Sequence, residues 1–272
     1  MVALLRASHF QPTLAVTAIT TALAATAGRG VAGSVWVALA ALSGQLSVGW
    51  GNDYLDRDRD RRGDRLDKPI VAGSVQARTV GIAAAVAAIA CVPLSLLSGW
   101  RAGLVHVAAV GIAWLYNGRL KRTVASPIPY VLAFGSLPAF VTLGLPGHPW
   151  PPAWSVAAAA LLGTGAHFVN AVPDIERDVR TETAGLPQRI GATASVLVAG
   201  VLLAIAAIVV AASVPDRGNV RDVALAAAAC AGVVAVALLA LTGHPRASWS
   251  LTLCVAALTV SMLMASGASL AP

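Results

Sequence analysis

Six of the twelve acidic residues in this 272-residue chain lie within residues 53–67, and three of them are regularly spaced. Asp53, Asp56 and Asp60 stand at positions i, i+3 and i+7, which places them on one face of a helix. Like charges on one face destabilise a helix unless a cation neutralises them. Mg²⁺ prefers oxygen ligands and is commonly held by one or two carboxylates together with substrate phosphates. The spacing therefore predicts a site for a magnesium diphosphate.

A second acidic cluster repeats the first. Residues 171–191 contain four more acids, and a shift of 118 residues aligns the two segments without a gap. The matched pairs are Asn52 with Asn170, Asp56 with Asp174, Asp60 with Asp178, Pro69 with Pro187, and Gly73 with Gly191. Asp53 falls on Ala171, so the second copy lacks that acid. A solvated loop whose acids and bases simply pair would explain one such segment, but five matches at one offset favour two halves of one site.

The rest of the chain is apolar enough to lie in a membrane. Charged residues make up 11% of the chain, against about 25% in soluble domains, and the mean hydropathy is +0.76. Period-two alternation is absent, so we expect a single all-α domain over 1–272, a membrane bundle of about nine helices. The predicted spans are 12–28, 31–50, 77–97, 102–118, 126–145, 153–170, 192–213, 222–241 and 248–268. The repeat divides them into two four-helix units and one additional helix.

The basic residues indicate how the bundle is oriented. With nine spans, one side carries the N-terminus and four loops, at 51–76, 119–125, 171–191 and 242–247. Together with Arg78, that side holds 15 of the 19 Lys and Arg residues. Basic loops remain in the cytoplasm, so we expect an integral protein of a bacterial plasma membrane with both Asp-rich loops cytoplasmic. Because the basic residues border membrane spans, the charge of +7 does not indicate a nucleic-acid partner.

Several segments together resemble a known family. The stretch NDYLDRDRD at 52–60 is similar to the first Asp-rich motif of the UbiA superfamily of intramembrane prenyltransferases, and NAVPDIERD at 170–178 is similar to its second. The stretches DKPIVAG at 67–73, LYNGRLKR at 115–122 and GLPQRIG at 185–191 also resemble segments of that family. The resemblance covers the whole chain and implies a prenyl diphosphate donor, bound through Mg²⁺, and a small aromatic or lipid acceptor.

The resemblance also implies roles for particular residues. The expected ligands of Mg²⁺ or diphosphate, which include the catalytic aspartates, are Asn52, Asp56, Asp60, Asn170, Asp174 and Asp178. Asp53 matches the motif as well and is expected to be a further metal ligand. The residues expected to contact the diphosphate are Lys68, Tyr116, Lys121 and Arg189, with Arg122 as the alternative to Lys121. His167 lies one turn before Asn170, where it would act as a base on the acceptor or hydrogen-bond the motif.

The chain departs from the family pattern near its N-terminus. Many members carry Arg before a Pro there, whereas this chain has Gln11 before Pro12. Arg6 and His9 are the candidates to replace that Arg.

Three activities remain open at this point. A prenyltransferase acting on an aromatic or quinone-precursor ring is the first. A terpene cyclase of the same fold would capture the allylic cation with the donor's own double bonds. A membrane transporter or scaffold would use the fold without catalysis. A CDP-alcohol phosphotransferase is disfavoured because the sequence has no DGxxAR-type stretch.

Overall fold

The computed structural model describes residues 2–180, 185–213, 220–265 and 270, and every regular element among them is helical. The N-terminal half contains α1 (Val2–Arg6), α2 (Phe10–Thr26), α3 (Gly30–Arg62), α4 (Ala77–Leu97), α5 (Trp100–Gly118) and the short 3₁₀ helix η1 (Leu120–Arg122). The C-terminal half contains α6 (Ile128–Gly135), α7 (Leu137–Thr142), α8 (Ala153–Ala171), η2 (Val172–Asp174), α9 (Ile175–Arg180), α10 (Leu186–Ser213), α11 (Val220–Leu241) and α12 (Pro245–Ala265).

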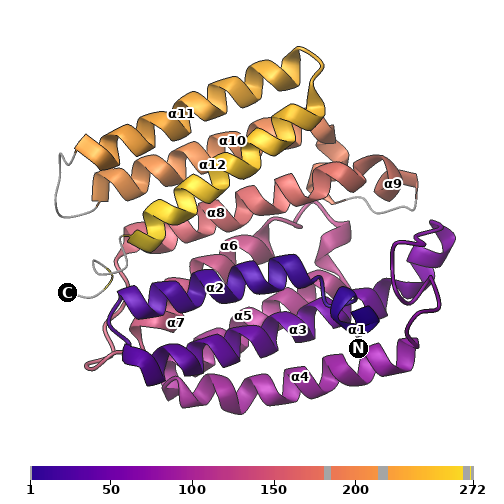
Figure 1. Cartoon of the computed structure of the whole chain (residues 1–272), viewed down its shortest axis with the longest axis horizontal. Helices are drawn as coiled ribbons and strands as arrows, with labels where there is room; N and C mark the ends of the chain where they lie inside the picture. The colour runs from indigo at the N-terminus through magenta and orange to yellow at the C-terminus, as the bar shows by residue number, and fades with distance from the viewer. Residues whose placement is uncertain (1, 181–184, 214–219, 266–269, 271–272) are drawn as a thin grey trace.

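The helices form one elongated bundle, in which the long helices run along a common direction (Figure 1). Within the described ranges, six helices are long and apolar enough to cross a membrane: α3, α4, α8, α10, α11 and α12. The three remaining predicted spans correspond to α2, α5 and the pair α6–α7. The predicted all-α membrane bundle is therefore confirmed. Residues 181–184 of the second Asp-rich loop and 266–268 of the last predicted span lie outside the described residues.

Three predicted boundaries differ from the structure. The span expected to begin at residue 192 begins as α10 at Leu186, within the predicted loop 171–191, and kinks at Gly191. The span expected over 126–145 is two short helices that meet at Ser136, because Pro138 lacks the N–H that a continuous helix would use. The span expected to end at residue 50 continues as α3 to Arg62. A helix of 33 residues is about 50 Å long, which exceeds the ~30 Å hydrocarbon core of a bilayer. The first Asp-rich motif is therefore part of a rigid helix and not of a loop.

Small residues let the helices approach closely. A Cβ on Gly103 of α5 would lie 2.6 Å from the Ser95 carbonyl oxygen of α4, and a Cβ on Gly163 of α8 would lie 2.2 Å from the Phe134 ring of α6. Neither position accommodates a larger side chain. This packing agrees with the abundance of Gly and Ala in the spans, since membrane helices associate through small residues at their interfaces.

The sequence repeat is also present in the backbone. Helices α2 and α6 begin at Phe10 and Ile128, which differ by the same 118 residues as the motifs. The matched Gly73 and Gly191 both have positive φ, of 70° and 82°. At Gly191 this angle, with ψ 171°, kinks α10 near its start in a region of backbone space that is nearly restricted to glycine.

We therefore predict that Gly73→Ala and Gly191→Ala each lower the unfolding free energy by about 1 kcal/mol or more, through backbone strain alone. At neither position would a Cβ meet an atom within 4 Å, so crowding does not contribute. Gly111→Ala is the matched control, because Gly111 is helical and its surroundings are equally open. Thermal unfolding in detergent micelles should show a lower midpoint for the first two variants and an unchanged or higher one for the control. Equal midpoints for all three would contradict the strain argument.

Candidate functional site

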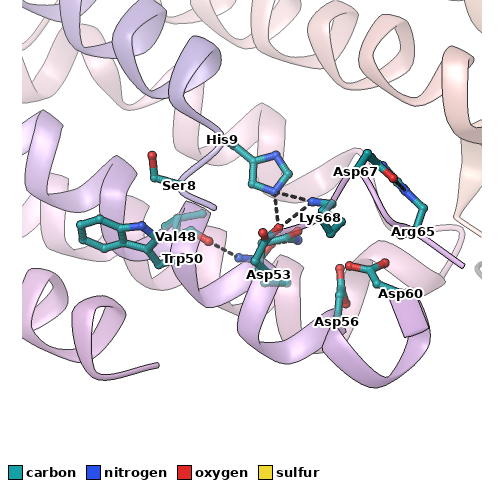
Figure 2. Close-up of polar contacts among 12 residues, drawn as sticks. Ser8, His9, Val48, Trp50, Asp53, Asp56, Asp60, Arg65, Asp67 and Lys68 are labelled. Atoms are coloured by element: carbon teal, nitrogen blue, oxygen red, sulfur yellow. Dashed lines mark hydrogen bonds and ion pairs between the residues drawn. The ribbon is translucent and has the colours of Figure 1, made fainter. Parts of the chain in front are cut away.

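The three aspartates of the first motif lie on one buried face of α3, as their spacing predicts. The Asp53, Asp56 and Asp60 side chains are only 2–5% exposed, whereas the interleaved Asp58 is 64% exposed. Figure 2 shows the three carboxylates pointing to the same side of the helix. The helix extension beyond the apolar segment therefore divides the acids of 51–62 into a buried functional face and a solvated one.

Asp56 forms the most deeply buried ion pair of the site. Lys121 Nζ, on η1, donates to Asp56 Oδ2 at 2.6 Å, and the Lys121 side chain is 6% exposed. Arg59 donates to Asp56 Oδ2 at 2.9 Å and lies 3.6 Å from Asp60. Burial lowers the pKa of Lys121, while the charge of Asp56 acts in the opposite direction. The ammonium group is thus held in place by the carboxylate that it neutralises.

The second motif is less regular and more exposed than the first. Asp174 ends η2, and Asp178 lies on α9, so a break in the helix separates the two acids. Asp174 is 3.3 Å from Arg177, and Asp178 accepts a 2.8 Å hydrogen bond from the Gln188 side chain. Asn170 lies exposed near the end of α8.

The two motifs face each other. A small pocket is lined by residues of both, namely Arg59, Asp60, Gly63, Arg65, Arg177 and Asp178. Arg65 bridges the halves, since it donates to Asp67 at 2.8 Å and its other terminal nitrogen is 3.7 Å from Asp174. The hydrogen bond from Arg65 lowers the pKa of Asp67 to about 2. The structure thus brings the predicted halves together at one end of the bundle.

The remaining predicted site residues occupy different environments. Asn52 donates to Asn117 Oδ1 at 3.1 Å, and Asn117 in turn donates to the Val48 carbonyl at 2.9 Å. Lys68 contacts Asp53 (Figure 2). Arg189 is exposed in the first turn of α10.

Tyr116 and His167 belong to a cluster of aromatic rings. The Tyr116 ring lies edge-on to Tyr130 and to His167, with centroid distances of 5.1 and 5.8 Å, and Tyr130 is 4.6 Å from His167. His167 is buried, and its Nε2 is 3.1 Å from Ser126 Oγ. Ser126 Oγ also accepts the Leu186 N–H at 3.0 Å. Ser126 therefore links His167 on α8 to the start of α10, and the role of His167 as a base stays a prediction.

The side-chain types of the two Asp-rich motifs suit a hard divalent cation. The acids supply only carboxylate oxygens, and Asn52 adds an amide, which is the chemistry that Mg²⁺ prefers. Among the residues that the structure describes, no three His, Cys, Asp or Glu side chains converge closely enough to hold a metal ion. The carboxylates are instead paired with Lys and Arg, so cations already occupy the positions near their oxygens.

Sequence analysis did not single out Asn117, Arg59, Arg65 or Ser126. Asn117 could have been identified from the sequence, because it is a polar residue at the end of an apolar span. In the structure it is 3% exposed and accepts a hydrogen bond from Asn52 of the motif helix. Arg59 could also have been identified, since it stands three residues after Asp56 and side chains at that spacing meet on a helix. Nothing in the sequence indicates the contact of Ser126 with His167 or that of Arg65 with Asp174, because the partners are 41 or more residues apart.

Comparison with known proteins identifies similar sequences and folds. The sequence model of the UbiA prenyltransferase family matches residues 13–215. No curated protein matches the chain. A solved structure of digeranylgeranylglyceryl phosphate synthase is 16% identical, with a TM-score of 0.72 and 98% of each chain covered.

Two archaeal structures are similarly close. A UbiA homologue from Aeropyrum pernix K1 is 19% identical with a TM-score of 0.72, covering 91% of this chain and 95% of its own. A UbiA homologue from Archaeoglobus fulgidus, solved with DMAPP and Mg²⁺, is 19% identical with a TM-score of 0.69, covering 98% of this chain and 99% of its own. At these identities, the structures show that the fold is shared.

The buried pair of Asp56 and Lys121 generates a stability prediction. Asp56→Ala should lower the unfolding free energy by about 3 kcal/mol, because it leaves a buried ammonium without its counter-ion. The double variant with Lys121→Met should recover at least half of that loss, and Asp58→Ala, at an exposed position, should change it by less than about 0.5 kcal/mol. Chemical or thermal unfolding in detergent measures the stability of the unmodified protein, the single variants and the double variant. A double variant as unstable as Asp56→Ala would show that the pair is not coupled.

Proposed function

This chain belongs to the UbiA prenyltransferase family, and on that premise we propose that it moves a prenyl group from an allylic diphosphate to an aromatic or quinone-precursor ring. The observation that carries the proposal is the small pocket between the two Asp-rich motifs, which Asp60 and Asp178 line together with three arginines. Such a pocket combines carboxylates for a metal with cations for phosphates. A transporter or scaffold would require neither.

The ligands of similar proteins support the choice of donor. The Archaeoglobus fulgidus homologue has been solved with DMAPP and Mg²⁺ and also with GPP and Mg²⁺. Four aspartates of this chain, Asp56, Asp60, Asp174 and Asp178, would hold Mg²⁺, with Asn52 and Asn170 beside them. When bound, Mg²⁺ neutralises the negative charge that develops on the diphosphate as the allylic C–O bond breaks.

The basic residues of the site would exchange partners when the donor binds. Lys121 and Arg59 now neutralise Asp56, and Arg65 bridges Asp67 and Asp174. A metal bound to those carboxylates repels the same cations, and the phosphate oxygens offer them new acceptors. Lys121, Arg59 and Arg65 are therefore positioned to hold the leaving diphosphate.

The departure of diphosphate leaves an allylic cation that must be shielded from water. The apolar spans provide a water-excluding surrounding for the prenyl chain. The rings of Tyr116 and Tyr130, next to the motif-bearing helix α8, offer π faces that attract a cation. His167 would then accept a proton from the acceptor ring. We place the Asp-rich end and the N-terminus in the cytoplasm of a bacterial cell, as the distribution of basic residues supports.

We expect purified protein in detergent to release diphosphate from a prenyl diphosphate, and to form a prenylated ring, only when Mg²⁺ and a suitable aromatic acceptor are present. Asp60→Asn and Asp178→Asn should each lower the rate by roughly 100-fold or more, because both line the metal–diphosphate pocket. Asp58→Asn is the matched control on the same helix, and EDTA should abolish turnover. Mass spectrometry of a donor-by-acceptor panel identifies the product.

Three outcomes of that panel would contradict the proposal. A cyclic hydrocarbon formed from donor alone would establish a terpene cyclase. No diphosphate release with any donor would favour a transporter or scaffold. Full activity of Asp60→Asn and Asp178→Asn, with unfolding midpoints equal to that of the unmodified protein, would refute the site assignment.

A further inference from the structure

The segment that precedes α2 packs against the first Asp-rich motif. Trp50 Nε1 donates to the Leu4 carbonyl of α1 at 2.8 Å. A Cβ on Gly49 would lie 2.1 Å from the Ser8 carbonyl oxygen, so only glycine allows this approach. Ala7 is fully buried in a cluster with Ile70 and Val80. Residues 2–9 therefore pack closely against α3 and against the segment that follows it.

A three-membered polar cluster joins these segments. His9 Nε2 lies 2.9 Å from Asp53 Oδ1, and Lys68 Nζ donates to the same oxygen at 2.6 Å. Lys68 Nζ is also 3.0 Å from His9 Nε2 (Figure 2). His9 has φ 53°, a left-handed conformation uncommon outside glycine, which persists only where the surroundings hold it. We call His9, Asp53 and Lys68 the N-terminal tie.

The second half of the chain has a tie in the corresponding place, built from different groups. Ser126, just before α6, bonds His167 on the motif-bearing α8 and accepts the N–H of Leu186 at the start of α10. At the 118-residue offset, Gly49 corresponds to His167 and Lys68 to Leu186. Each half therefore links the start of its first helix, its motif helix and the segment after the motif.

The groups of the N-terminal tie are absent from the second half. At the same offset, His9 corresponds to Pro127, Asp53 to Ala171 and Lys68 to Leu186. All three polar members are lost together, whereas Asn52, Asp56 and Asp60 are all retained as Asn170, Asp174 and Asp178. Residues that coordinate the metal are expected to recur in both halves. Asp53 has no counterpart in the second half, as is true of its partners His9 and Lys68, whereas the other motif residues are retained.

We propose that Asp53 and His9 are positioning residues, and that Asp53 is not a metal ligand. The Asp53 side chain is 2% exposed, and its Oδ1 lies within hydrogen-bond distance of Lys68 and His9, whereas its buried Oδ2 has no hydrogen-bond partner among the described residues. The tie fixes the Lys68 ammonium at the Asp-rich end of α3, where it attracts the diphosphate of the donor. The inference rests on the proposed function for the metal site and for the consequence for donor binding, but not for the contacts of the tie itself.

Metal binding distinguishes a positioning residue from a ligand. Mn²⁺ is titrated into the protein with inorganic diphosphate, and the free ion is followed by electron paramagnetic resonance. Asp53→Ala should keep the Mn²⁺ affinity within about twofold, whereas Asp60→Ala should lower it by roughly tenfold or more. An Asp53→Ala loss as large as that of Asp60→Ala would make Asp53 a ligand and overturn the proposal.

Hydrogen exchange tests the tie without reference to metal or activity. His9→Ala and Asp53→Ala should each raise the exchange rate of the amides of residues 2–9 about tenfold. The double variant should add little, because either change breaks the same contact. Asp53→Asn, which still offers an oxygen to Lys68, should restore most of the protection. Additive effects of the single variants, or unchanged exchange, would refute the tie.

The donor kinetics test the consequence for Lys68. Asp53→Ala should raise KM for the prenyl diphosphate about tenfold and leave kcat within threefold, since it displaces a binding cation and not a metal ligand. A fall in kcat alone would contradict the positioning role. If the unmodified protein neither binds Mn²⁺ with diphosphate nor turns over, the proposed function fails, while the exchange experiment still decides whether the tie exists.

Discussion

Buried carboxylates need counter-charges, and this requirement organises one whole end of the protein. Three aspartates of α3 are almost fully removed from water, and burying an unpaired charge costs several kcal/mol. Each carboxylate therefore has a basic group nearby, and these come from different parts of the chain: Lys68 after α3, Lys121 on η1 and Arg59 on α3 itself. The connecting segments are folded over the bundle end because they carry the cations that α3 requires.

The same constraint explains why charged and apolar regions coexist without conflict. Helix α3 is long enough to extend beyond an apolar layer, so its acids lie where basic side chains from other segments can reach them. The aromatic cluster of Tyr116, Tyr130 and His167 is built from α5, α6 and α8, and α8 leads directly into the second motif. The charged residues of the two motifs and the aromatic and apolar residues of the spans thus adjoin in one molecule.

The internal repeat supplies the framework, but the two halves have diverged in how they are secured. The backbone features that require glycine, at Gly73 and Gly191, recur. The polar contacts that join the start of the first helix to the motif helix do not recur. His9 and Asp53 make this contact in one half, and Ser126 and His167 make it in the other. The first half carries an additional buried acid and the second has a broken, more exposed motif. The halves are therefore inequivalent, as the match of Asp53 with Ala171 predicts.

The sequence by itself determined the helical membrane fold, the repeat and the identity of the acidic residues, because these depend on hydropathy and on spacing along one helix. The i, i+3, i+7 pattern was enough to separate Asp53, Asp56 and Asp60 from Asp58. It did not determine where α3 ends, since charged residues continue a helix as readily as they begin a loop. Only the tertiary structure decided which cation meets which acid, as with Lys121 and Asp56 or Arg65 and Asp174, because residues so far apart in sequence meet only through the packing of the helices between them.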